Sequence, residues 1–206
     1  GVDRLTTIVV GKGEHVVAVY EDVHGDDCND LEIPSAMNIV GDLGVAKSEI
    51  VVVGGIYFKK WIQGNCHLQH LTLRHAKRNG VFGWSSFTME DVLVEQCGGQ
   101  GVGAVGTGAR TGVVGRCTNV EVRQCGLSGV LASAGASITL IGAKTTVHHN
   151  CTIGISDEYG LSVNGSSSAI IQLVAPLTKE QVAIDNGGGG NWGAKYGGDI
   201  NQIKTV

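Results

Sequence analysis

Apolar and polar residues alternate along four stretches of the chain that can be aligned with one another. The stretches are Leu71–Val81, Val92–Val102, Val120–Val130 and Thr145–Ile155, and their starts lie 21, 28 and 25 residues apart. In each stretch the alternation ends at a small or amide residue, and a glycine then precedes Val or Ile. Alternation with a period of two is typical of β-strands, whose successive side chains point to opposite faces. The regular spacing predicts a repeat architecture with one coil per stretch.

The alignment predicts which side chains each coil turns toward the core. Three inward columns are expected: Leu71, Val92, Val120 and Thr145; Leu73, Val94, Val122 and Val147; and Val81, Val102, Val130 and Ile155. Glycines are expected where each coil needs a positive φ or a close backbone approach, at Gly80, Gly101, Gly129 and Gly154. Small or amide residues occupy the bend, at Ala76, Cys97, Cys125 and Asn150. Beside them, His75, Gln96, Gln124 and His149 are expected to form a polar ladder.

Parallel coils of this length predict an all-β fold, a single right-handed parallel β-helix of about seven to eight coils. Weaker forms of the pattern extend over residues 31–56 and 161–174. We therefore expect residues 1–175 to form the β-helix. Residues 176–206 are expected to be a tail of the same domain that folds back as a cap.

Composition narrows the classes of partner. Net charge is −4, which argues against a broad nucleic-acid interface, and no apolar run is long enough for a membrane span. No signal peptide is visible, and the chain opens in mid-pattern. Residues 1–14 contain only a short apolar strand to cap the solenoid, so we expect either a larger chain or end-to-end self-association. None of the six cysteines forms a CxxC pair, so free core thiols are predicted, which mildly favours a reducing compartment.

The aligned repeats resemble the pectate-lyase-like superfamily, in particular its generic right-handed β-helix region members, over roughly residues 31–175. The superfamily includes polysaccharide lyases, hydrolases and epimerases, phage tailspikes, adhesins and noncatalytic recognition modules. The resemblance implies the fold and brings no catalytic signature, because fold alone does not select among these activities.

One outward column carries most of the candidate chemistry. Arg74, Glu95, Arg123 and His148 form a charged stripe, with Glu121 on the neighbouring column. The resemblance implies that Glu95 could bind Ca²⁺ against a uronate substrate while an arginine acts as base. Glu95 and Glu121 are also the nearest approach to the carboxyl pair of an inverting hydrolase. The alternative is an exposed ladder of salt bridges.

The remaining candidates lie in loops and aromatic positions. The acidic run from Glu21 to Asp30 is interpreted as a solvated loop, and residues 107–115 as a protruding loop. His75 and His149 share a column but lie three coils apart, too far to share a metal, and no metal site is predicted. Trp and Tyr side chains can stack on sugars. We therefore expect Trp84, Trp192 and Tyr196 to be candidate ligand-binding residues. For the last two, docking of the tail is the alternative.

Three functions are compatible with these observations. The first is a noncatalytic module that recognises a glycan or a protein partner, which the lack of a clear acid pair favours. The second is a polysaccharide-active enzyme, a polyuronate lyase or epimerase or a glycoside hydrolase, with Ca²⁺ as a cofactor if it is lyase-like. The third is a structural spacer.

Overall fold

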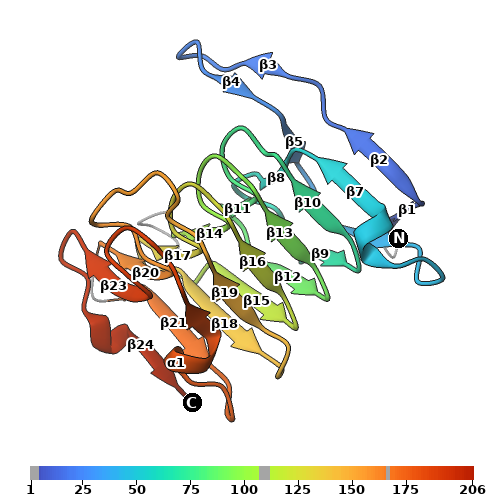
Figure 1. The fold of residues 1–206 in the computed structure, drawn as a ribbon. Coiled ribbons are helices and arrows are strands. Elements are labelled where there is room, and N and C mark those ends of the chain that lie inside the picture. Colours follow the sequence, from blue (N-terminus) through green and yellow to red (C-terminus); the bar gives the residue numbers. More distant parts are fainter. Residues whose placement is uncertain (1–4, 107–111, 166–167) are drawn as a thin grey trace.

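The protein is a parallel β-helix. The computed structural model describes residues 5–106, 112–165 and 168–206. The strands in these ranges form three parallel sheets that run along the stack of coils, and one short antiparallel pair (Figure 1). Each coil adds one strand to each sheet, and its strands pair in parallel with those of the next coil. The described residues make seven such coils and the first strand of an eighth. The predicted parallel β-helix of about seven to eight coils is confirmed.

The three sheets are numbered by the order in which each coil contributes its strands to them. Sheet 1 contains β1 (Thr6–Val10), β6 (Met37–Gly41), β9 (Cys66–Gln69), β12 (Phe87–Glu90), β15 (Val114–Thr118), β18 (Ser137–Ile141), β21 (Ile170–Leu173) and β24 (Ile203–Thr205). Sheet 2 contains β2 (Gly13–Val16), β7 (Ile50–Val53), β10 (Thr72–Arg74), β13 (Leu93–Glu95), β16 (Glu121–Arg123), β19 (Thr146–His148) and β22 (Ala183–Ile184).

Sheet 3 completes each coil and carries the candidate site described below. It contains β5 (Asp30–Ile33), β8 (Gly55–Phe58), β11 (Val81–Gly83), β14 (Val102–Val105), β17 (Val130–Ser133), β20 (Leu161–Asn164) and β23 (Trp192–Lys195). A hairpin of β3 (Tyr20–Glu21) and β4 (Asp27–Cys28) is inserted in the first coil, and Figure 1 shows it standing away from the stack. The short helices are η1 (Lys47–Glu49), α1 (Lys179–Val182) and η2 (Ile200–Gln202).

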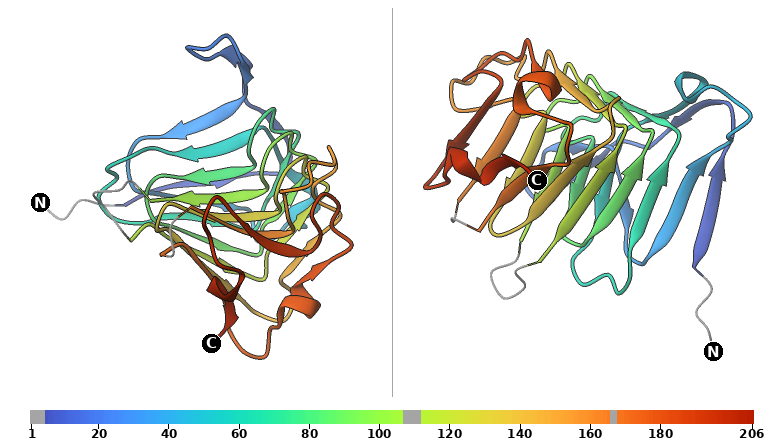
Figure 2. Two further views of the ribbon diagram at one scale, coloured as in Figure 1. Left: turned by 90° about the vertical axis from the view of Figure 1, so that its left-hand side faces the viewer. Right: turned by 90° about the horizontal axis from the view of Figure 1, so that it is seen from below.

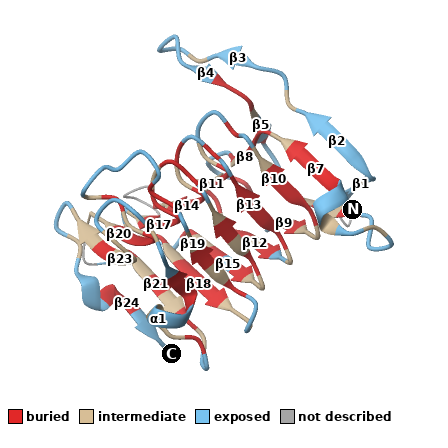
Figure 3. Cartoon of the chain, in the orientation of Figure 1, coloured by how far each residue is buried: buried red, intermediate tan, exposed pale blue. Residues whose placement is uncertain are grey.

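The core is a continuous apolar column inside the coils (Figure 3). The first two predicted inward columns are buried throughout, with Leu73, Val94, Val122 and Val147 fully so. The third column is correct except at its last member. Ile155 is 43% exposed, and Leu161 pairs with Val130 in its place. The chain makes a longer excursion in this coil, so the glycine that precedes the strand is Gly160 and the predicted Gly154 lies in the excursion.

The glycine column exists because backbones approach closely there. A Cβ on Gly101 would lie 2.2 Å from Val122 Cγ1 and 2.7 Å from the Gly129 carbonyl oxygen. Positive φ angles occur instead in the polar ladder, where His75, Gln96 and Gln124 have φ of 55°, 55° and 56°. Gln96 donates a hydrogen bond to Gln124 at 3.3 Å, as expected for a ladder.

The small residues at the bend behave as predicted. All six cysteines are buried and free, and burial raises the pKa of Cys117 to about 12. Asn150 points inward: its Oδ1 accepts a hydrogen bond from the Cys125 amide, and its Nδ2 donates to the Val122 carbonyl. The cysteine column is therefore a set of small core residues.

The C-terminal segment extends the solenoid in register. Residues 176–206 supply β22, β23 and β24, which pair in parallel with β19, β20 and β21. The expectation that this segment folds back as a cap is therefore corrected: it adds further coil and covers the end of the core with Val182 and Ile203, both buried. The N-terminal and C-terminal coils lie at opposite ends of the stack (Figure 2).

The N-terminal end of the stack exposes apolar side chains. In the described residues, β1, β2 and β5 each pair on one side only within their sheets. Val9 is 67% exposed and Val16 is 72% exposed, beside an apolar groove of about 500 Å³ that also contains Ile56 and Leu73. An end-to-end partner at this surface stays a prediction of the sequence.

Candidate functional site

The β3–β4 hairpin forms one wall of a cleft on the outer face of sheet 3. Asp22 closes its turn, because Oδ1 of Asp22 accepts hydrogen bonds from the amides of His24 and Asp26. These backbone hydrogen bonds lower the pKa of Asp22. Arg78, on the turn before β11, donates to Asp22 Oδ2 at 3.0 Å and lies 3.5 Å from the Cys28 sulfur. The hairpin is thereby attached to the third coil.

A second anchor lies at the base of the hairpin. Asn29 is buried; it accepts a hydrogen bond from the Lys77 amide at 2.7 Å and donates to the His75 carbonyl at 3.2 Å. Lys77 also pairs with Asp27 at 3.2 Å. These contacts join residues about fifty positions apart and tether the base of the hairpin to the third coil.

Aromatic side chains form the floor and far side of the cleft. Glu32, Tyr57 and Phe82 occupy one outward column of sheet 3, because β5 pairs with β8 and β8 pairs with β11 in register. The rings of Tyr57 and Phe82 are stacked, with centroids 6.2 Å apart and an interplanar angle of 11°. Trp84 meets Phe82 edge-on at 6.1 Å. We refer to Tyr57, Phe82 and Trp84 as the aromatic row.

Two carboxylates from β5 border the aromatic row. Asp30 and Glu32 are two residues apart and therefore project from the same face of the strand. Glu32 pairs with Lys59 at 2.6 Å. Asp30 has no ion pair within 4 Å among the described residues, and burial raises its pKa although the charge of Arg78 acts in the opposite direction. An acid held in a cleft without a direct counter-ion is a candidate ligand contact.

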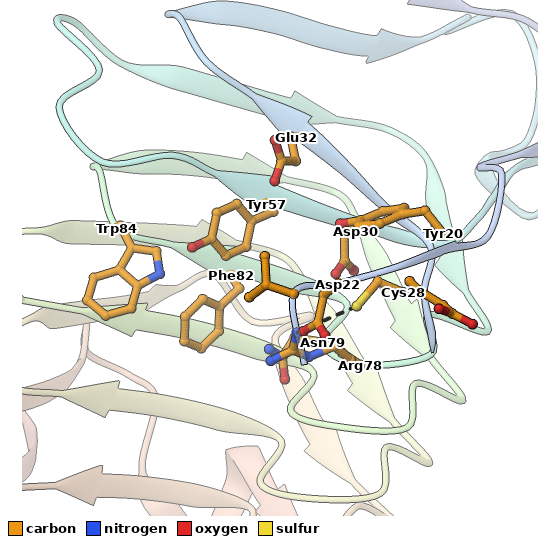
Figure 4. A pocket seen from close by; sticks show the side chains of 12 residues that line it. Tyr20, Asp22, Cys28, Asp30, Glu32, Tyr57, Arg78, Asn79, Phe82 and Trp84 are labelled. Atoms are coloured by element: carbon orange, nitrogen blue, oxygen red, sulfur yellow. Dashed lines mark hydrogen bonds and ion pairs between the residues drawn. The ribbon is translucent and has the colours of Figure 1, made fainter. Parts of the chain in front are cut away.

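Together these elements enclose a cleft of about 560 Å³, here called the hairpin cleft (Figure 4). Its volume lies within the range typical of small-molecule sites. The view shows the aromatic row on one side and Arg78, Asp22 and Asp30 on the other. The lining residues are Tyr20, Glu21, Asp22, Val23, Cys28, Asp30, Glu32, Tyr57, Arg78, Asn79, Phe82 and Trp84.

The charged stripe predicted on sheet 2 is present as one ion-pair network. Strand pairing aligns Arg74, Glu95, Arg123 and His148 in a single column. Arg74 binds one carboxylate oxygen of Glu95 at 2.6 Å, and Arg123 binds the other at 2.7 and 2.8 Å. Arg123 and His148 also bind Glu121, at 3.0 and 3.1 Å.

Both oxygens of Glu95 are thus occupied by guanidinium groups, and its side chain is only 4% exposed. Burial acts to raise the pKa of Glu95, but the hydrogen bonds from Arg123 and Arg74 prevail and lower it. Arginines paired in this way remain protonated, so neither is a suitable base. The stripe does not fit a Ca²⁺ site, since Ca²⁺ requires six to eight oxygen ligands.

The three aromatic candidates do not form one site. Trp84 borders the hairpin cleft, whereas Trp192 lies in β23, four coils away, or roughly 19 Å along the axis at the usual strand spacing. Trp192 is partly buried against the core, as a residue of a strand that continues the solenoid. Tyr196 is 75% exposed, next to Lys195.

Several residues of the cleft were missed by sequence reasoning. The acidic run, interpreted as a solvated loop, contributes Asp22 and Asp30 to the cleft walls. Extending the repeat alignment into the first two coils would have placed Glu32 and Tyr57 beside Phe82. Residues 107–111 of the predicted protruding loop lie outside the described residues, and Val114 and Gly115 belong to β15.

Comparisons with known proteins assign no family. No family model, no curated protein and no solved structure matches the chain. Within the described ranges, no cluster of three or more His, Cys, Asp or Glu is arranged for a metal ion. The same ranges contain no helix of the length and hydrophobicity needed to cross a membrane.

Proposed function

We propose that the protein is a noncatalytic β-helix module that binds a glycan in the hairpin cleft. The aromatic row carries this proposal. Aromatic rings supply flat apolar area that suits the faces of sugar rings, and carboxylates beside them suit sugar hydroxyls. Here stacked rings of neighbouring coils lie next to Asp30 and Glu32 in one cleft. The resemblance of the repeats to the pectate-lyase-like superfamily, which includes carbohydrate-recognition proteins, also supports it.

The cleft floor favours a sugar over an extended peptide. Its residues project from β5, β8 and β11. The backbone groups of β8 and β11 are already paired with strands on both sides, and the open edge of β5 lies on the side away from β8 and the aromatic row. A peptide added as a strand needs an open edge, whereas a sugar needs ring faces and polar side chains. The floor offers the latter.

Calorimetric titration with a panel of neutral, acidic and amine-bearing oligosaccharides tests the proposal. Phe82→Ala should weaken binding of any active glycan by about tenfold or more, since stacked aromatic contacts contribute roughly 0.5–1.5 kcal/mol beyond their buried area. Tyr196→Ala is the matched control, because Tyr196 is an exposed ring four coils away. The proposal fails if no member binds, or if both variants bind equally well.

One observation favours an enzyme as the second candidate. The Cα atoms of Asp30 and Glu32 stand roughly 6.6 Å apart on an extended strand, a spacing compatible with the carboxyl separation of inverting glycosidases. The raised pKa of Asp30 suits a general acid, while Glu32 would activate water. Incubation of a bound oligosaccharide followed by mass analysis distinguishes the two candidates. Cleavage that Asp30→Asn abolishes would establish the hydrolase; an intact ligand supports the binding module.

A further inference from the structure

We infer that the glycan taken by the hairpin cleft carries free amino groups, as a glucosamine oligomer does. The inference rests on the proposed function and names the ligand class of the same site. It also departs from the polyuronate considered for the charged stripe, because the two surfaces differ in charge.

The charges that line the cleft are mostly negative. Four lining residues are acidic, namely Glu21, Asp22, Asp30 and Glu32, and one is basic, Arg78. Arg78 is engaged by Asp22, and Lys59, from outside the lining, engages Glu32. Asp30 remains without an ion pair among the described residues. A uronate would add a further negative charge to this set, whereas an ammonium group would supply the missing partner.

The neighbouring groups point in the same direction. The pKa of Tyr20 is raised by burial and by the negative charges of Asp30 and Glu32, while the charge of Arg78 acts in the opposite direction. The pKa of Asp30 is raised by burial, with Glu32 adding to the effect and Arg78 opposing it. The hairpin and β5 therefore bring negative charges close together in a partly buried cleft, and a bound cation would stabilise them.

The aromatic row can also accept an ammonium group. Lys60 Nζ lies 4.2 Å from the centre of the Trp84 ring, so the chain already places one ammonium on this ring. Cations are attracted to aromatic faces, most strongly to Trp. Lys60 itself is exposed, and a ligand ammonium can replace it without uncovering the core. The cleft thus offers aromatic rings on one side and a carboxylate without a described ion pair on the other. An amino sugar suits both, since its ring can stack on the aromatic row while its ammonium group pairs with Asp30.

Calorimetric titration of the whole chain with four probes tests this inference. The probes are a deacetylated β-1,4-glucosamine hexamer, its fully N-acetylated counterpart, a galacturonate hexamer and a lysine-rich peptide. We expect the glucosamine hexamer to bind about tenfold or more tightly than the acetylated one, as a charge-assisted hydrogen bond allows. Asp30→Asn should remove that difference, so that the two hexamers bind about equally well. Glu90→Gln, an exposed acid on sheet 1, is the control.

Each outcome decides between specific alternatives. Equal binding of both hexamers overturns the amine inference and leaves glycan binding intact. Binding of none of the three sugars overturns the proposed function as well. If the peptide binds more tightly than any sugar, the ligand of the cleft is a basic protein segment and not a glycan. If Asp30→Asn does not fold, added salt provides the test on the native protein: the preference for the amine must weaken between low and high ionic strength, and a salt-independent preference contradicts the inference.

Discussion

At the scale of single residues, Glu95 shows how the outward face of sheet 2 is stabilised. Its carboxylate is nearly buried beneath Arg74 and Arg123, and each oxygen accepts hydrogen bonds from a different guanidinium group. A buried carboxylate is unfavourable unless it is paired, so the two arginines are required partners. The network therefore stabilises three consecutive coils, which is a structural role.

Glu95 should make the protein sensitive to acid. Its folded-state pKa is lowered from 4.5, so its contribution to stability is fully present above that value and is lost as the pH falls through the folded-state pKa. At pH 7, Glu95→Gln should lower the free energy of unfolding by about 1.5–3 kcal/mol, the contribution of a charge-assisted hydrogen bond. Urea unfolding between pH 3 and pH 7 measures both effects. If Glu95→Gln matched the exposed control Glu90→Gln at every pH, the structural role would be wrong.

At the scale of elements, the turns before the strands of sheet 3 depend on close backbone contact. A methyl group on Gly101 would overlap Val122 and the carbonyl of Gly129, and neither can withdraw without moving the core. Gly101→Ala should therefore destabilise the protein by about 1–3 kcal/mol, the usual cost of overpacking. Gly11→Ala is the control, since a Cβ there meets nothing within 4 Å. Thermal melting that left both variants unchanged would contradict the close packing of the glycine column.

A buried ion pair ties the last full coil to the preceding ones. Lys195 on β23 and Glu158 on the excursion before β20 are 9% and 7% exposed, and Ser128 also donates to Glu158. Removing one partner leaves a buried charge, so Lys195→Met should cost about 3–5 kcal/mol, whereas Lys195→Met with Glu158→Gln should cost much less. Chemical denaturation of the single and double variants measures this. Additive costs would mean that the two residues do not interact.

At the scale of the whole molecule, the sequence predicts what repeats and misses what does not. Leu73, Val94 and Val122 could be placed in the core because each coil imposes the same alternation on its strand. The hairpin wall of the cleft has no such periodic signal, and the floor becomes visible only when the alignment is extended into the first two coils. The cleft depends on one insertion, whose Asp22 meets Arg78 56 positions later, and on rings brought together only by strand register. Gly154 and Ile155 were misplaced because one coil carries a longer excursion than the others.

The three tryptophans, Trp61, Trp84 and Trp192, allow the place of glycan binding to be measured directly. Trp84 borders the hairpin cleft, whereas Trp192 lies four coils away. Each indole N–H gives one NMR resonance, which Trp→Phe variants assign. On addition of the glucosamine hexamer, the Trp84 resonance should shift most and that of Trp192 should stay in place. A shift at Trp192 with none at Trp84, or no shift at any indole, would contradict binding in the hairpin cleft.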